Sequence, residues 1–168
     1  MTISIAARCA RTGAFGVAIS SSSPAVGARC PNVRAGVGAV STQNVTDPRL
    51  GPALLDALAT GMDAHSALAQ VSASATYPEY RQLTVVDNEG RAAVFSGDKS
   101  LGINAEVITE NCAAAGNLLA NPNVIKLSTP KAKSDTKAKQ SVIVNVKSTG
   151  EYVINGKSVS IDQMSAVI

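Results

Sequence analysis

The chain has 168 residues, and its 15 Lys and Arg against 12 Asp and Glu give a formal net charge of +3. This length suffices for one domain with its own core, and with 3% aromatic residues and no Trp we do not expect a surface that stacks nucleic-acid bases. No apolar run reaches the roughly 18 residues of a membrane helix and no charged leader opens the chain, so we expect a cytoplasmic protein without membrane or nucleic-acid contacts.

Cysteine and histidine are scarce. Cys9, Cys30 and Cys112 have no CxxC spacing, so neither a disulfide framework nor a zinc site is indicated, and we expect three small buried side chains. Any Ser-His-Asp or Cys-His machinery would depend on His65 alone, which lies in an alanine-rich stretch where a solvated helix position is expected. We therefore expect no metal and no cofactor.

The first predicted elements are strands. Apolar residues alternate with small or polar ones over residues 2–7 and 15–20, which is the period of two that indicates β-structure. The short connection Arg11-Thr12-Gly13 predicts an antiparallel hairpin. A third strand is predicted over residues 35–42, whose glycines would let another backbone or a ligand come close.

Two helices are predicted next. Asp47 as N-cap and Pro48 at the first helical position open the first helix, which carries leucines on one face and stops at Gly61. Asp63 caps the second helix. We expect the leucine face to pack on the sheet, because only that phase buries the apolar stripe.

Further strands follow these helices. They are predicted over residues 82–86 and 91–96, joined by turn residues, and over the shorter segments 106–108 and 112–115. Two adjacent helices set between antiparallel strands predict an α+β layered sandwich. We assign residues 1–125 to this one domain.

The composition changes at Ile125. Up to that residue the basic side chains are seven Arg and one Lys, whereas from Lys126 onward they are seven Lys and no Arg. Alanine falls from 24 residues before the change to three after it. Folding does not demand such a switch, so we interpret it as a boundary between segments of different ancestry. A lysine-rich tail on one natural gene is the alternative.

Three segments are predicted beyond this boundary. Residues 126–140 have no apolar periodicity and indicate a solvated, lysine-rich linker. Residues 141–154 alternate around a turn and predict a β-hairpin, and residues 155–168 contain a tight turn and a predicted short helix. We expect this C-terminal appendage to complete a sheet edge, within one chain or between subunits.

Five blocks of the first 125 residues resemble one family. They occur in the order Met1–Arg8, Gly13–Ala18, Arg34–Gln43, Tyr80–Asp87 and Gly116–Ala120. Together they resemble the bacterial and archaeal family named domain of unknown function 1028, which is grouped with the N-terminal-nucleophile (Ntn) hydrolases. The resemblance implies an Ntn-hydrolase-like sandwich, and a truncated one, because family members usually continue after Asn117 with more helix and strand.

The resemblance also implies a reaction. Ntn hydrolases cleave amide bonds with an N-terminal Thr, Ser or Cys whose free α-amine is the general base, and the pKa of roughly 8 of such an amine lies close to neutral pH. Thr2 is the matching residue once Met1 is removed; alternatively, it is an ordinary strand-initiating residue. Arg34 matches, by strand order, the basic residue that tunes the nucleophile in proteasome-type relatives, although those relatives carry lysine there.

Other residues are candidates for substrate binding. Ser20 and Ser21 lie where those relatives carry an acid. Gln43 and Asn117 each follow a strand, so their amides could donate hydrogen bonds to a substrate carbonyl; capping and turn duties are the alternative. The implied substrate is a small acyl amide or peptide.

The function that the sequence implies stays open between three alternatives. One is an amide-bond hydrolase that uses Thr2, and another is a catalytically silent, homo-oligomeric binding module that keeps the scaffold. The third is a recombined fusion product, because residues 126–168 resemble the opening of the TolR/ExbD biopolymer-transport periplasmic domain. A free Thr2 amine would distinguish the first alternative from the others.

Overall fold

The computed structural model describes residues 1–128, 144–146, 152–154 and 157–159. The chain divides into two compact units, Met1–Pro130 and Lys131–Ile168. Each unit is described by itself. Among the described helices, none combines the length and the apolar composition that crossing a membrane requires.

The first unit contains two antiparallel four-stranded sheets. Sheet A has the order β2-β1-β8-β7 and sheet B the order β3-β4-β5-β6. The strands are β1 (Thr2–Arg8), β2 (Phe15–Ser21), β3 (Pro31–Arg34), β4 (Gly38–Asn44), β5 (Arg81–Asp87), β6 (Ala92–Ser96), β7 (Ala105–Thr109) and β8 (Cys112–Asn117). The helices are α1 (Val26–Arg29), α2 (Leu50–Ala59), α3 (Ala64–Ser74) and α4 (Val124–Ser128), with a 3-10 turn, η1, at Pro78–Tyr80.

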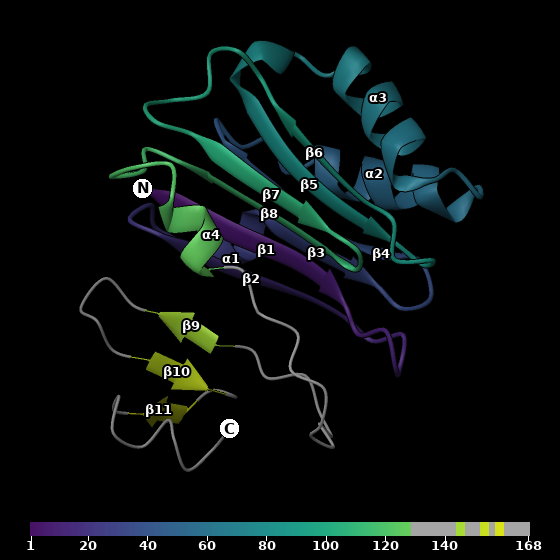
Figure 1. Ribbon diagram of the computed structural model, residues 1–168, viewed down its shortest axis with the longest axis horizontal. Helices are drawn as coiled ribbons and strands as arrows, with labels where there is room; N and C mark the ends of the chain where they lie inside the picture. The colour runs from purple at the N-terminus through teal and green to yellow at the C-terminus, as the bar shows by residue number, and fades with distance from the viewer. Residues whose placement is uncertain (129–143, 147–151, 155–156, 160–168) are drawn as a thin grey trace. The chain divides into compact units, whose positions relative to one another are not determined.

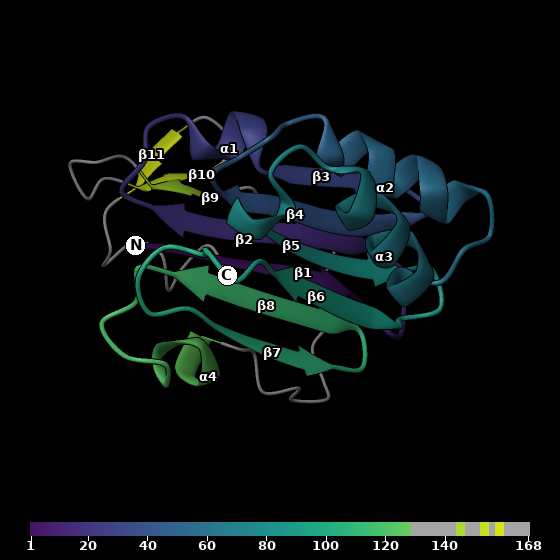
Figure 2. The same cartoon turned by 90° about the horizontal axis from the view of Figure 1, so that it is seen from above.

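These elements form layers. Strands β1 and β8 of sheet A pack against β4 and β5 of sheet B, and α2 and α3 cover the other face of sheet B (Figures 1 and 2). The first unit is therefore a layered α+β sandwich, as the order of predicted elements implied. The N-terminus lies at the end of sheet A where β8 finishes, because β1 and β8 run antiparallel (Figure 2).

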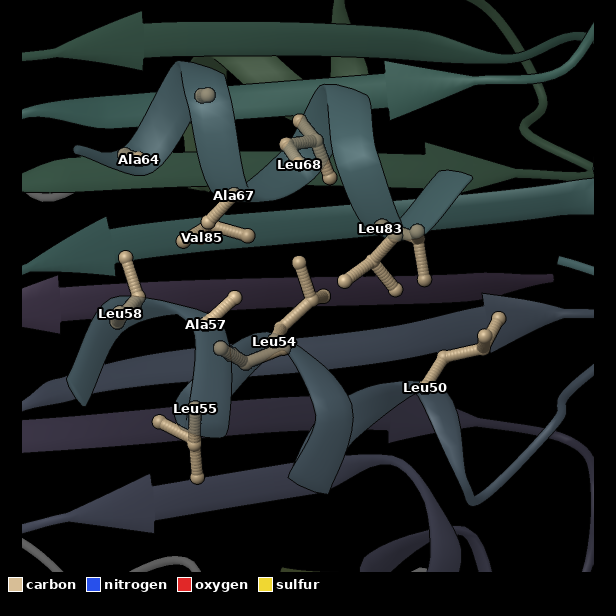
Figure 3. Packing of buried hydrophobic residues seen from close by; sticks show 13 residues of the cluster. Leu50, Leu54, Leu55, Ala57, Leu58, Ala64, Ala67, Leu68, Leu83 and Val85 are labelled. Atoms are coloured by element: carbon tan, nitrogen blue, oxygen red, sulfur yellow. The ribbon is translucent and has the colours of Figure 1, made fainter. Parts of the chain in front are cut away.

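Two apolar clusters hold the layers together. Between the helices and sheet B, leucines of α2 pack with residues of α3 and with Leu83 and Val85 of β5 (Figure 3). This confirms the predicted leucine face, and Asp63 caps α3 as predicted, its side chain accepting a hydrogen bond from the Ser66 N–H at 2.7 Å. Between the two sheets, a cluster of mostly small residues fills one part of the layer: Ala6, Ala39, Val86, Ala92 and Ala113.

The strand predicted over residues 35–42 is present as β4 but begins only at Gly38, and residues 35–37 form the turn of a hairpin with β3, which was not predicted. Strand β3 ends at Arg34, which pairs with Gly38, and Gly36 takes a φ of 73° in the turn between β3 and β4. A pattern of small residues continues through this turn, so alternation alone does not reveal it. Helix α1 was also not predicted, because its four residues form too short a segment to show a helical period.

Smaller differences concern single residues. Helix α2 begins at Leu50 rather than at Pro48, and Asp47 accepts a hydrogen bond from the Arg49 N–H at 3.0 Å. Of the three cysteines, only Cys30 is buried; Cys9 is exposed and all three are free thiols.

The described residues of the second unit form three short strands. Strands β9 (Val144–Val146), β10 (Tyr152–Ile154) and β11 (Lys157–Val159) pair in an antiparallel sheet of order β11-β10-β9. The pairing of β9 with β10 confirms the predicted hairpin, and β11 adds a strand. The short helix predicted near the C-terminus lies outside the described residues, and so do residues 129–140 of the predicted linker. Lys126, at the start of that predicted linker, belongs to α4.

Candidate functional site

The inner face of sheet A is polar at the end where the chain begins. Thr2 pairs with Ser21 on β2 and with Asn117 on β8, and directly paired residues point to the same face of a sheet. The Asn117 side-chain amide donates to Oε1 of Gln82 on sheet B at 3.0 Å. All three paired side chains therefore face sheet B, in the layer between the sheets.

Three buried amides, Gln43, Gln82 and Asn117, connect the two sheets; we call them the amide cluster. Nε2 of Gln43 donates to Oε1 of Gln82 at 2.7 Å and to the carbonyl of Ala115 at 3.0 Å. Nε2 of Gln82 donates to the carbonyl of Gly116 at 3.2 Å. Because backbone carbonyls only accept, these two contacts fix which end of each glutamine amide carries the nitrogen.

This orientation changes the role expected for Gln43. Both hydrogens of its Nε2 are used, so Gln43 cannot donate to a substrate carbonyl here. Its Oε1 is buried and has no hydrogen-bond partner within the described residues, so the atom that it can offer to a ligand is an acceptor. Asn117 uses one amide hydrogen on Gln82 and keeps a second to donate.

Residues that the sequence analysis did not single out extend the amide cluster. Nε2 of Gln82 also donates to Oγ of Ser96 at 3.0 Å, and Oγ of Ser96 donates to Oε2 of Glu106 at 3.0 Å. Gln82 thus joins Gln43 and Asn117 to a carboxylate on the edge strand β7. Its sequence signal is weak, because every residue of β5 is buried and Gln82 is one of four polar residues on that strand.

The hydroxyl of Thr2 lies against that of Ser21. Their oxygen atoms are 2.8 Å apart, and Oγ of Ser21 also accepts a hydrogen bond from the Ser23 N–H at 3.0 Å. The carbonyl of Met1 accepts from the Ser22 N–H at 3.3 Å. Thr2 and Ser21, both predicted site residues, are therefore brought together beside Asn117, and Met1 continues the pairing past the end of β1.

Two predicted site residues lie elsewhere. A Cβ at Gly38 would meet Cδ1 of Leu58 at 2.7 Å, so Gly38 and its partner Arg34 face the helices. Nη2 of Arg34 forms an ion pair with Asp56 at 2.7 Å. The expectation that Arg34 tunes Thr2 is therefore wrong, because sheet B separates them. Ser20 pairs with Ile3 and, as the neighbour of Ser21 on one strand, points to the opposite face.

Hydroxyl groups near the amide cluster have unused hydrogen-bonding capacity. Oγ of Ser4, Oγ of Ser41 and Oγ1 of Thr84 are buried without a partner in the described part of the chain. Ser4 lies two residues from Thr2 on β1. Ser41 and Thr84 pair with each other and lie two residues from Gln43 and Gln82, on the same face of sheet B. A buried polar group without a partner costs about 1–3 kcal/mol, which favours the binding of water or a ligand polar group at this end of the layer.

No group of three or more His, Cys, Asp or Glu side chains suited to a metal ion occurs among the described residues. Thr2 is also without a charged hydrogen-bond partner in that part of the chain.

Comparison with known proteins places this fold in a family. The model of a family of unknown function, DUF1028, matches residues 2–151, which extends past Ile125. Among solved structures, the crystal structure of protein SPO2555 from Silicibacter pomeroyi, a DUF1028 protein, is similar with 27% sequence identity and a TM-score of 0.72. The similarity covers 78% of this chain and 64% of that one, less than two thirds of its length. No curated protein matches.

Proposed function

We propose that this chain, which belongs to the DUF1028 family of unknown function, hydrolyses amide bonds with Thr2 as an N-terminal nucleophile. The observation that carries the proposal is the position of the Thr2 hydroxyl, 2.8 Å from that of Ser21 and on a strand paired with Asn117. A nucleophile, a hydroxyl that orients it and an amide donor are thereby grouped at one end of the layer between the sheets.

The reaction begins with removal of Met1, which frees the α-amine of Thr2. That amine accepts the proton of Oγ1, directly or through one water, while Oγ1 attacks the carbonyl carbon of the substrate amide. The unused amide hydrogen of Asn117 donates to the negatively charged oxygen that develops. The proton then passes from the α-amine to the leaving nitrogen, the C–N bond breaks, and water hydrolyses the ester on Thr2.

The amide cluster supports this arrangement indirectly. Gln82 accepts from Asn117 and donates to the carbonyl of Gly116, the residue next to Asn117. The Asn117 side chain is therefore held from two directions, and such positioning of a donor before the reaction is what makes it effective. Gln82 is a positioning residue in this proposal and does not touch the substrate.

A catalytically silent binding module is the second candidate. It is favoured by one observation, the location of Arg34 on the helix side of sheet B in an ion pair with Asp56. With Arg34 there, the Thr2 amine lacks the cation that the family resemblance assigned to tuning it. The two candidates differ in whether the wild-type protein hydrolyses an amide substrate at all.

The test combines processing with turnover. Intact mass and N-terminal sequencing establish whether Met1 is removed, and hydrolysis of a panel of aminoacyl p-nitroanilides is then measured. We expect Thr2→Ala to abolish hydrolysis, Thr2→Ser to retain part of it, and Ser21→Ala to lower kcat. Ser20→Ala is the matched control, because Ser20 lies on the same strand and faces away. Hydrolysis by Thr2→Ala at the wild-type rate would overturn Thr2 as the nucleophile, and no hydrolysis by wild-type protein that has lost Met1 would favour the binding module.

A further inference from the structure

We propose that Val45, Leu101, Ile103 and Leu118, here called the apolar rim, bind an aliphatic group attached to the carbonyl carbon of the substrate. The preferred substrates would then be amides of acyl groups with bulky aliphatic side chains. This inference rests on the proposed function, since it assigns a substrate class to the site at Thr2.

Hydrogen bonds link the segments that carry the apolar rim. Oδ1 of Asn44, the residue before Val45, accepts from the Leu101 N–H at 3.2 Å. The Leu101 carbonyl accepts a hydrogen bond from the Leu118 N–H at 2.9 Å. The Ile103 carbonyl accepts one from the Leu119 N–H, also at 2.9 Å. The segment that links β6 to β7 therefore ties the ends of β4 and β8 together, and the four apolar residues lie on these linked segments.

The rim begins next to the amide cluster. Asn44 follows Gln43 on β4, and Leu118 follows Asn117 at the end of β8. In the proposed reaction Asn117 holds the carbonyl oxygen, so the two groups bonded to the carbonyl carbon, the acyl substituent and the leaving amine, come near Leu118, and the proposal assigns the apolar rim to the acyl substituent. Apolar walls around a few polar groups are typical of sites for small molecules.

The four rim side chains are unusually open for their type. Their exposed fractions lie between 44% and 49%. Leu118 has a φ of 51°, a region where glycine or asparagine fits without strain and a bulky side chain does not. Its backbone would be satisfied by glycine, and the isobutyl group, whose Cδ2 lies close to Gly102, leaves about half of its surface open to a ligand. Strained residues of this kind gather at ligand sites.

Gln43 adds a polar requirement to the same substrate. Its Oε1 is a buried acceptor without a partner in the described residues, and such an atom favours a ligand that carries an N–H group. An α-amino acid amide with an aliphatic side chain offers both features, an amine beside the carbonyl and an apolar group on the same carbon.

The experiment compares leucine p-nitroanilide with glycine p-nitroanilide, which share a leaving group and differ in the aliphatic side chain. We expect the wild-type protein to favour the leucine compound about 10- to 100-fold in kcat/KM. Leu118→Gly should bring the ratio close to one, and this variant keeps the fold because glycine suits the backbone there. Ile108→Ala is the control, an exposed residue that pairs with Ala113, four positions along β8 from Asn117; its ratio should not change.

Other results separate the two proposals. Equal hydrolysis of both compounds, or a ratio that Leu118→Gly leaves intact, would overturn the rim while the hydrolase stands. If neither compound is hydrolysed, NMR titration of Thr2→Ala protein with leucinamide and glycinamide decides the matter. Shifts of the Leu101 and Leu118 amides with leucinamide alone would support the rim without hydrolysis, and no shifts would overturn it. A fall in mass of Leu118→Gly by light scattering, with the ratio intact, would identify the rim as a contact between subunits.

Discussion

Replacing Leu54 by alanine tests how α2 is attached to sheet B. Leu54 has no exposed surface and belongs to the cluster that includes Leu83 and Val85 (Figure 3). Three carbon atoms are removed, and at about 0.8 kcal/mol for each buried CH₂ the lost transfer free energy is about 2.4 kcal/mol. The cavity left between helix and sheet adds to this loss, so we expect the free energy of unfolding to fall by about 2–5 kcal/mol.

The measurement is urea-induced unfolding followed by far-ultraviolet circular dichroism. Asp56→Ala on the same helix is the matched control, because the Asp56 side chain is 70% exposed and its ion pair with Arg34 is solvated; its loss should stay below about 1 kcal/mol. A loss below about 0.5 kcal/mol for Leu54→Ala, or equal losses in both variants, would refute the view that this helix face holds the layer together.

Three further predictions concern charge and the C-terminal unit. Asp87 is buried and accepts hydrogen bonds from three backbone N–H groups and from Arg91, so Asp87→Asn should lower the free energy of unfolding by about 3 kcal/mol; a loss below about 1 kcal/mol would contradict this. Hydrogen bonds from Arg49 lower the pKa of Asp47 from 3.8 to about 2, so its contribution to stability is complete above about pH 4 and is lost as the pH falls towards 2. The melting temperature of the wild type should therefore fall more steeply over that range than that of Asp47→Asn, and parallel curves would count against it. Deleting residues 131–168 should change the mass measured by light scattering or lower solubility, if the hairpin completes a sheet edge; an unchanged mass and melting temperature would show it to be a passenger.

Local patterns predicted most elements of the first unit because each strand or helix has a clear period there. The alternation around Thr2–Arg8 and Phe15–Ser21 and the leucine face of α2 are examples, and each matches an element of the structure. The hairpin of β3 and β4 was missed because its turn, residues 35–37, has the same small apolar residues as the start of β4, residues 38–40. The period of apolar residues indicates which side chains are buried on one face of an element. A turn built from small apolar residues does not interrupt that period, so the period does not reveal the turn.

The candidate site was predicted only in part, for a reason of strand geometry. Thr2, Ser21 and Asn117 are brought together because neighbouring strands hold them in register. Arg34 is not, because a shift of one residue along a strand moves a side chain to the other face. Its orientation depends on the turn at Gly36, which the sequence did not reveal. Gln82 was missed because its role depends on pairing with Gln43 and on packing against sheet A, and neither is local in sequence.

The layer between the sheets contains more apolar contact at one end than at the other. Apolar contact among Ala6, Ala39 and Ala113 closes one part of it, whereas amides and unpaired hydroxyls occupy the part around Thr2. Less buried apolar surface means a lower free energy of local opening, so fluctuations that part the sheets should start at the Thr2 end. In native-state hydrogen exchange, the backbone amide of Asn117 should then exchange with deuterium before that of Ala113 on the same strand. Access of a ligand to the layer between the sheets would accordingly depend on local opening at the Thr2 end, while the alanine contacts at the other end keep the strands in register.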